Sequence, residues 1–243
     1  MEHIVENEHG RFTIVQDEKY GFWRVSPPPS QEYIRSFYEK QYINPTYSFH
    51  DELYADLVKR WVPEVAQNGG KVLEIGCGSG DKLLAFQAAG FEVYGFEPGT
   101  ADCEICQSKG LKVFNRPFDI ATAASPGLYS IVLLSNILEH VPDPGKMLQD
   151  IYPLVEPQGV LLIDVPNEFN AFQEIFLTKT NERPWFLAPP AHLNYFTPDS
   201  LSNLLLAKGW AIHHRTTRFP MELFLLMGRN YVSEPELGRP AHL

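Results

Sequence analysis

The chain has 243 residues, enough for one or two domains. It carries 20 Lys and Arg against 30 Asp and Glu, and the resulting charge of −10 argues against a general nucleic-acid-binding protein and against polybasic attachment to an anionic membrane. Hydrophobic residues make up 44% of the chain, which excludes wholesale disorder. Three cysteines cannot build a disulfide framework, and the acidic start MEHIVENEHGR lacks the pattern of a signal peptide. We therefore expect a cytoplasmic protein with neither a nucleic-acid nor a membrane partner.

The N-terminal region predicts a hairpin followed by helices. Residues 11–25 contain two strand-like stretches around Asp17-Glu18-Lys19. Prolines 27–29 form an extended linker, after which Ser30 can cap a helix. A second helix is expected to start at Ser48, with its apolar side chains on one face. Residues 1–66 are accordingly expected to form an N-terminal hairpin and helical cap.

From residue 71 onward, strand-like and helix-like segments alternate. This order is typical of βαβ units, and hence of an α/β fold with a mostly parallel, doubly wound sheet. The strand candidates are residues 71–76, 91–97, 111–114, 128–134 and 159–167, and the helix candidates are residues 82–90, 101–110 and 144–155.

The last part of the chain predicts one helix and two strands. The helix covers residues 197–209, with Thr197 as N-cap, Pro198 in the first turn and Gly209 at its end. The two strand candidates are WAIHHRTT at 210–217 and ELFLLMG at 222–228.

A Gly-rich turn, Gly76-Cys77-Gly78-Ser79-Gly80, connects a buried strand to a helix. Glycines allow a ligand to approach the backbone, and free N–H groups at the helix start attract an anion. The dinucleotide fingerprint G-x-G-x-x-G would require glycine at position 81, which is Asp81. Because Asp81 would repel a pyrophosphate but accept from an ammonium group, the turn favours a ligand with both a carboxylate and an amine.

Glu97 ends the second strand candidate, 21 positions after Gly76. An acid at this place accepts both hydroxyls of a ribose in nucleotide-binding α/β folds. The alternative is a solvated charge at a strand end.

An ordered series of motifs over roughly residues 71–210 carries a family resemblance. The motifs are EIGCGSG, the acid in GFEPG, LYSIVLLSNILEHVPDP, LVEPQGVLLIDVPN and HLNYFTPDSLSNLLLAKGW. The series resembles the class I S-adenosylmethionine-dependent methyltransferases, and its last block is similar to the subgroup of ubiquinone-pathway O-methyltransferases. The terminal block RFPMELFLLMGRNYV resembles methyltransferases of polysaccharide pathways.

The resemblance implies a Rossmann-like, doubly wound sheet of seven strands, mostly parallel with the last antiparallel, in an S-adenosylmethionine-binding domain at residues 67–243. It also implies the cofactor-binding residues. Those around the methionine part are Glu74, Gly76, Cys77, Gly78 and Gly80, with Ser135 and Asn136 beneath it. Those around the nucleoside are Glu97 at the ribose and Phe96, Pro98, Pro117, Phe118 and Asp119 near the adenine.

Three residues are acid–base candidates. Glu139 and His140 follow the fourth strand, at the mouth of the expected site, and His192 follows an aromatic, proline-rich loop. Histidine titrates near neutral pH and can take a proton from an acceptor. The alternative is that these side chains order their loops.

The leading functional hypothesis is methyl transfer from S-adenosylmethionine to a small-molecule acceptor, sugar-type or phenolic and quinone-like, by in-line displacement. An NAD(P)-dependent oxidoreductase and a non-catalytic cofactor-binding protein are the alternatives. Metal binding is not expected, because Cys103 and Cys106 have no second ligand pair at zinc-site spacing. The acceptor atom, the use of a general base, the oligomeric state and the length of the natural chain stay open.

Overall fold

A computed structural model describes residues 2–40, 51–180, 184–217, 220, 222–229 and 234. Its contacts group the chain into two compact units: a central unit, Ser36–Val165, and a composite unit, Met1–Arg35 with Pro166–Leu243. The domain boundary expected between residues 66 and 67 falls inside the central unit. Contact density does not decide which segments fold independently, so that boundary stays a prediction.

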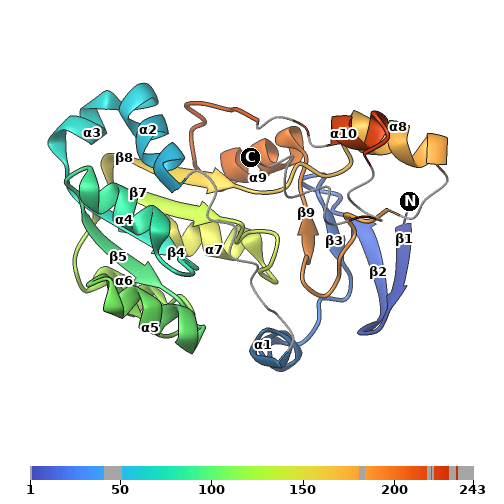
Figure 1. Ribbon diagram of the computed structural model, residues 1–243, viewed down its shortest axis with the longest axis horizontal. Coiled ribbons are helices and arrows are strands. Elements are labelled where there is room, and N and C mark those ends of the chain that lie inside the picture. Colours follow the sequence, from blue (N-terminus) through green and yellow to red (C-terminus); the bar gives the residue numbers. More distant parts are fainter. Residues whose placement is uncertain are drawn as a thin grey trace. The chain divides into compact units, whose positions relative to one another are not determined.

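A five-stranded parallel sheet organises the described part of the central unit (Figure 1). The strand order is β6-β5-β4-β7-β8, so the first strand of the Gly-rich motif lies in the middle. This arrangement confirms the expected Rossmann-like α/β fold. The strands are Lys71–Ile75 (β4), Glu92–Phe96 (β5), Lys112–Phe114 (β6), Tyr129–Ser135 (β7) and Val155–Asp164 (β8).

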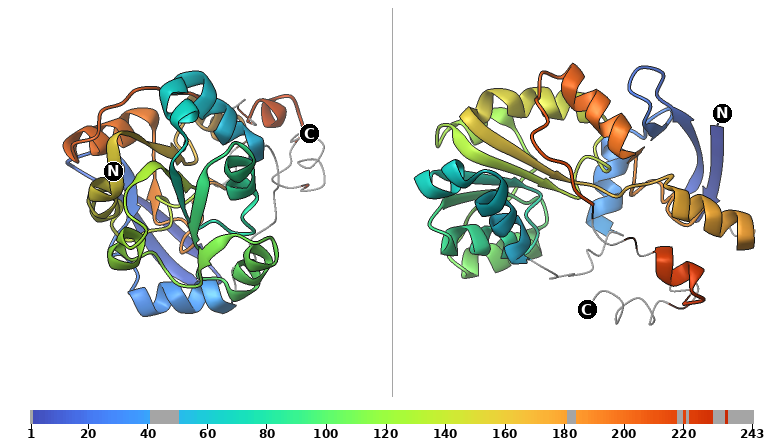
Figure 2. Two further views of the ribbon diagram at one scale, coloured as in Figure 1. Left: turned by 90° about the vertical axis from the view of Figure 1, so that its left-hand side faces the viewer. Right: turned by 90° about the horizontal axis from the view of Figure 1, so that it is seen from above.

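Helices cover both faces of this sheet, with α4 and α7 on opposite sides (Figure 2). Helix α2 packs against α4, and Tyr54, Ala55 and Val58 of α2 are buried with side chains of β4 and β7. The helix expected to start at Ser48 is therefore present as α2, although Ser48 lies outside the described residues. The helices are Asp51–Trp61 (α2), Pro63–Asn68 (α3), Asp81–Ala88 (α4), Thr100–Ser108 (α5), Ile120–Ala124 (α6), Pro144–Ile151 (α7) and the 3-10 turn Tyr152–Leu154.

Within the described residues the parallel sheet has five strands, fewer than the seven that the resemblance implies. Every residue of β7 is buried, as expected of a strand covered on both faces, whereas the apolar residues 160–163 of β8 are only half-buried. Strand β8 forms the edge of the described sheet. The expected strands at 210–217 and 222–228 are wrong: the first segment has no regular structure, and the second forms helix α10, Glu222–Leu226.

An antiparallel sheet of order β1-β2-β3-β9 lies in the composite unit. The expected hairpin is confirmed, because β2 (Gly10–Gln16) and β3 (Trp23–Val25) pair antiparallel. Strands β1 (Glu2–Asn7) and β9 (Asn194–Tyr195) were not foreseen. Ile14, Trp23 and Tyr195 are buried together in the core of this unit.

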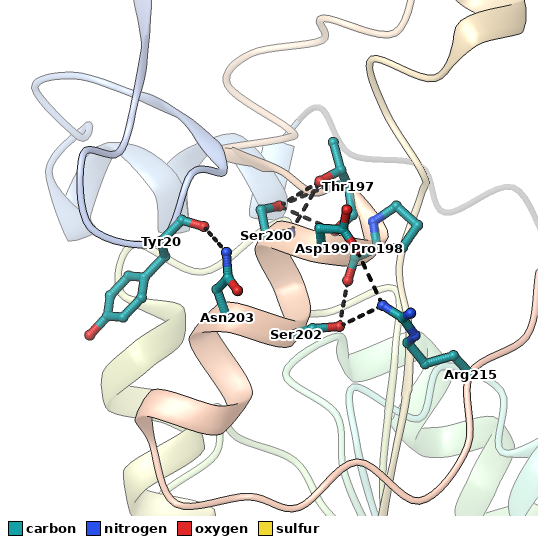
Figure 3. Close-up of polar contacts among 8 residues, drawn as sticks. All are labelled: Tyr20, Thr197, Pro198, Asp199, Ser200, Ser202, Asn203 and Arg215. Atoms are coloured by element: carbon teal, nitrogen blue, oxygen red, sulfur yellow. Dashed lines mark hydrogen bonds and ion pairs between the residues drawn. The ribbon is translucent and has the colours of Figure 1, made fainter.

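The expected helix at 197–209 is confirmed as α9, Pro198–Ala207. Thr197 and Ser200 form a reciprocal capping box at its start, and further polar contacts join Asn203 to Tyr20 and Arg215 to Asp199 (Figure 3). Ser30 accepts a hydrogen bond from the Tyr33 N–H, as expected of a cap, at the start of α1 (Gln31–Lys40). The remaining helix is α8, Ala171–Thr180. The role of the N-terminal helices as a cap stays a prediction.

None of the helices in the described part of the chain is long and apolar enough to cross a membrane.

Candidate active site

The parallel sheet of the central unit brings most of the expected cofactor-binding residues to one edge. In a parallel sheet the carboxyl ends of all strands lie at the same edge, where open α/β folds bind their ligands. The Gly-rich turn follows β4, Glu97 follows β5, Pro117 follows β6 and Asn136 follows β7. The edge therefore gathers segments that are far apart in sequence.

The Gly-rich turn has the backbone that only glycine adopts readily. Gly76, Gly78 and Gly80 have φ values of 70°, 52° and 78°, all in the left-handed region. Gly80 is the N-cap of α4, and its carbonyl accepts from the Leu84 N–H at 3.0 Å. The N–H groups of the first turn of α4 have no carbonyl four residues earlier in the helix, so this helix start favours an anion.

Glu97 joins the turn after β4 to the turn after β5. It is only 9% exposed, and its carboxylate accepts from the Gly78 N–H at 2.8 Å and from the Gly99 N–H at 2.7 Å. Burial raises the pKa of Glu97 while these two hydrogen bonds oppose the rise. A solvated charge, the alternative to ribose binding, does not describe this buried carboxylate.

The charges around the turn are paired within the chain. Glu74 on β4 is fully buried, and the Lys82 Nζ of α4 lies 3.5 Å from its Oε1. Asp81 forms an ion pair with Lys109 at 2.6 Å. The sequence argument assigned the Asp81 carboxylate to a ligand ammonium group; in the structure the Lys109 ammonium already balances this charge, and the contact with a ligand stays a prediction.

Two of the five residues expected near the adenine have structural roles. Phe96 is fully buried and its ring packs against Phe114 and Phe118, with centroids 5.0 and 5.5 Å away. Asp119 is the N-cap of α6, accepts from the Thr122 N–H at 2.9 Å and pairs with Arg116. Pro98 and Pro117 are exposed and Phe118 is half-buried, so these three surfaces are open to a base.

Ser135 and Asn136 stand at the end of β7. Ser135 is buried, and its Oγ lies 2.9 Å from the hydroxyl of Tyr54. Asn136 is exposed and has a φ of 55°, which is uncommon for a residue with a side chain. Its N–H donates to the Asp164 carbonyl at 2.8 Å.

The acid–base candidates divide between the two units. In the central unit Glu139 is 1% exposed, and the His140 Nε2 lies 3.8 Å from its Oε1. The His140 N–H donates to the Ile137 carbonyl, which orders this turn. In the composite unit His192 is half-buried, with its ring 6.3 Å from that of Tyr195, whose hydroxyl donates to the His192 carbonyl.

Sequence reasoning missed three residues at this edge of the sheet. Tyr54 was identified only as part of an apolar helix face, and Lys82 and Asp164 were not singled out. The sequence offered a signal for Lys82 alone among these three. This lysine lies four positions after Gly78, in the first turn of the helix that follows the Gly-rich turn.

A family model described as a methyltransferase domain matches residues 47–215. The ubiquinone biosynthesis O-methyltransferase of Bordetella pertussis is 32% identical over 115 residues, which cover 44% of this chain and 48% of that protein. The protein of the same name from Pectobacterium carotovorum is 30% identical over 105 residues, covering 41% of this chain and 44% of its own length. The chain thus spans about half the length of these curated relatives.

Among solved structures, a magnesium protoporphyrin IX methyltransferase from Synechocystis PCC 6803 with bound SAH is similar in fold. The TM-score is 0.52 at 19% identity, covering 77% of this chain and 87% of that one. The chain belongs to the methyltransferase-domain family, and the expected resemblance to S-adenosylmethionine-dependent methyltransferases is confirmed.

Proposed function

We propose that this chain transfers a methyl group from S-adenosylmethionine to a small-molecule acceptor. One observation carries the proposal: the left-handed Gly-rich turn and the buried Glu97 carboxylate form a single hydrogen-bonded arrangement at the carboxyl ends of the two central strands. Membership of the methyltransferase-domain family supports it. The same membership disfavours the oxidoreductase alternative.

The residues present fit this cofactor. A Cβ on Gly76 would lie 2.2 Å from Ile137 Cδ1, and a Cβ on Gly80 would lie 2.5 Å from Leu111 Cδ1, so the packing of these side chains against the turn requires glycine at both positions. The α4 N-terminus suits the carboxylate of a methionine part, and Glu97 suits two ribose hydroxyls. Glu74, Gly76, Cys77, Gly78 and Gly80 would surround the methionine part, with Ser135 and Asn136 beneath it.

S-adenosylmethionine brings its own activated methyl group as a sulfonium. The chain therefore has to hold the acceptor in line and exclude water, and proximity supplies much of the acceleration. A hydroxyl acceptor must also lose a proton. Glu139 with His140, and separately His192, are the groups we propose for that step.

For the acceptor we propose a phenolic or quinone-like small molecule. The printed name of the curated relatives, ubiquinone biosynthesis O-methyltransferase, supports this class. A sugar-type acceptor is the second candidate, because the terminal block at residues 218–232 resembles methyltransferases of polysaccharide pathways.

The test is release of S-adenosylhomocysteine (SAH) from S-adenosylmethionine in the presence of catechol-type phenols or of nucleotide sugars. We expect acceptor-dependent SAH formation with the phenols. Formation with the sugars alone would move the acceptor to the second class. No formation with any acceptor, despite SAH binding, would favour a non-catalytic cofactor-binding protein.

The role of His192 has its own test. His192→Ala is expected to lower turnover about 100-fold without changing SAH affinity, because a positioned base contributes a factor of this order. His213→Ala removes an exposed histidine of the same unit and is the matched control. Full activity of His192→Ala would remove this residue from the acid–base candidates.

A further inference from the structure

We propose that Tyr54 is a positioning residue of the cofactor site, which holds the left-handed turn after β7 in the geometry that the cofactor requires. The inference rests on the proposed function, because it concerns the same site. Tyr54 lies on α2 (Asp51–Trp61), a helix that sequence reasoning had assigned to the N-terminal cap.

Tyr54 hydrogen-bonds to the ends of two neighbouring strands at once. It is 6% exposed, its hydroxyl donates to Asp164 Oδ2 at 2.7 Å, and the same hydroxyl lies 2.9 Å from Ser135 Oγ. Ser135 ends β7 and Asp164 ends β8. A buried phenol hydroxyl without these partners would be shielded from water and would have no hydrogen bond to replace it, which is unfavourable. The two contacts of the Tyr54 hydroxyl therefore stabilise its position. One side chain from α2 therefore joins the carboxyl ends of β7 and β8.

The turn held between these two strands contains Asn136. Its φ of 55° lies in the left-handed region, which asparagine adopts more readily than other residues with a Cβ but less readily than glycine. The hydrogen bonds around this residue therefore help to keep the turn in this conformation. The Asn136 N–H donates to the Asp164 carbonyl, and the adjacent Ser135 contacts the Tyr54 hydroxyl. Asn136 is thus hydrogen-bonded to Asp164 and follows Ser135 in the chain, and the Tyr54 hydroxyl contacts the side chains of both of these residues.

Tyr54 also approaches the buried acid on the central strand. The Lys82 Nζ lies 5.9 Å from the centroid of the Tyr54 ring and 3.5 Å from Glu74 Oε1. An ammonium at this distance is attracted by the face of an aromatic ring. The Tyr54 ring consequently helps to hold the Lys82 ammonium beside Glu74, while the Tyr54 hydroxyl holds Ser135. Both Glu74 and Ser135 are proposed to surround the methionine part of the cofactor.

Phenylalanine removes the hydroxyl and keeps the ring. In Tyr54→Phe, the packing of α2 on α4 and the contact with Lys82 remain, whereas the bonds to Ser135 and Asp164 are lost. A hydrogen bond to a charged acceptor is worth about a factor of ten or more, so we expect Tyr54→Phe to weaken SAH binding about tenfold. The KM for S-adenosylmethionine should rise more than kcat falls, because the phenol acts on the site and not on the reacting atoms.

Tyr129→Phe is the matched control. Tyr129 is fully buried at the other end of β7, and its hydroxyl donates to the Ala123 carbonyl at 2.7 Å. The variant Tyr129→Phe also loses one buried hydrogen bond, but at the start of β7, whereas the proposed site lies at the end of this strand. We expect Tyr129→Phe to lower the melting temperature and to leave the SAH affinity unchanged.

The experiment is calorimetric titration of SAH into the full chain and the two variants, with the melting temperature of each. A selective loss of affinity in Tyr54→Phe supports the proposal. Unchanged affinity in Tyr54→Phe, or equal losses in both variants, overturns it while leaving the proposed function standing. A wild-type chain that does not bind SAH would overturn both.

If Tyr54→Phe does not fold, Asp164→Ala carries the same test. Asp164 is half-buried, and its removal takes away the acceptor of the Tyr54 hydroxyl without altering α2. We expect the same selective loss of SAH affinity, and unchanged affinity would overturn the proposal.

Discussion

Gly80 is a residue at which the Gly-rich turn tolerates no side chain. Its φ is 78°, and an added Cβ would lie 2.5 Å from Leu111 Cδ1 and 2.8 Å from Cys106 Sγ, both in buried residues. Left-handed backbone and overpacking each add a cost, so Gly80→Ala should lower the free energy of unfolding by about 3 kcal/mol. Urea denaturation measures this change.

Gly90→Ala is the control for Gly80→Ala. Gly90 has a φ of 94°, but nothing lies within 4 Å of the position where its Cβ would stand. We expect only the conformational cost there, about 1 kcal/mol. Equal losses in the two variants would contradict the crowding around Gly80.

The buried Glu168 of the composite unit makes the stability depend on pH. Glu168 is 5% exposed, and Gln173 Nε2 donates to its Oε2 at 2.8 Å and to Glu222 Oε1 at 3.1 Å. Burial raises the pKa of Glu168 to about 7 against the hydrogen bond from Gln173, and the Glu222 carboxylate adds to the rise. The folded chain therefore holds a proton at Glu168 that the unfolded chain releases near pH 4.5.

The sign follows from this raised pKa. The contribution of Glu168 is fully present below about pH 4.5 and is lost as the pH rises through about 7, amounting to on the order of 3 kcal/mol. Glu168→Gln should flatten the melting temperature across this pH range. Glu174→Gln, at an exposed position of α8, should retain the wild-type profile. If the melting temperature of Glu168→Gln depended on pH as steeply as that of the wild type, the assignment to Glu168 would be contradicted.

At the scale of single residues, spacing predicted backbone better than it predicted side-chain partners. Gly76, Gly78 and Gly80 form the turn that the sequence predicted, and all three adopt the left-handed backbone that glycine reaches at little cost. The pairing of Asp81 with Lys109 could not be predicted, since 28 residues separate them and only the packing of α5 beside the turn brings them together. Asp119 illustrates the same limit, because an acid after a strand serves equally as a helix cap.

Helix α9 is an element whose N-cap the sequence predicted correctly, and this cap is testable. The Thr197 hydroxyl accepts from the Ser200 N–H, and the Ser200 hydroxyl accepts from the Thr197 N–H (Figure 3). Thr197→Ala should lower the free energy of unfolding by about 1 kcal/mol. Thr178→Ala, which removes a hydroxyl bonded to Glu174 in the interior of α8, should change it by less than about 0.5 kcal/mol. Equal effects would contradict the capping role.

Among the elements, those in the alternating series of strands and helices and those with a capping pattern were predicted, whereas the late apolar run at residues 222–228 was assigned wrongly. Residues 222–228 were expected as a strand and contain helix α10, because a run of this length fits either structure. Strand β9 has two residues and exists only through its pairing with β3. Pairing between segments about 170 residues apart leaves no local signal in the sequence.

For the whole molecule, the cofactor should stabilise the fold by mass action. A ligand that binds only the folded state at 100 times its Kd adds about 2.7 kcal/mol to the free energy of unfolding. We expect SAH to raise the melting temperature and NADH to leave it unchanged. Stabilisation by NADH and not by SAH would contradict the proposed function and favour the oxidoreductase alternative.

The fold class of the whole chain followed from alternating strands and helices, because each parallel strand pair needs a crossover. The antiparallel sheet of the composite unit did not follow, since it joins the first 25 residues to residues 194–195. The structure also shows where some of the acidic residues of the chain lie. Part of the excess is buried, in Glu74, Glu97, Glu139 and Glu168, rather than spread over the surface.

The measurement that tests the central claim most directly is calorimetric titration of SAH into the wild-type chain, Glu97→Ala and Glu92→Ala. Glu97 follows β5 and is buried between the Gly-rich turn and Gly99, whereas Glu92 is an exposed acid at the start of β5. Glu97→Ala removes the charged group that we propose as acceptor of the two ribose hydroxyls, so it should weaken SAH binding about 100-fold. Glu92→Ala should bind SAH with the affinity of the wild type. Equal affinity in all three proteins, or no binding by the wild type, would contradict the account.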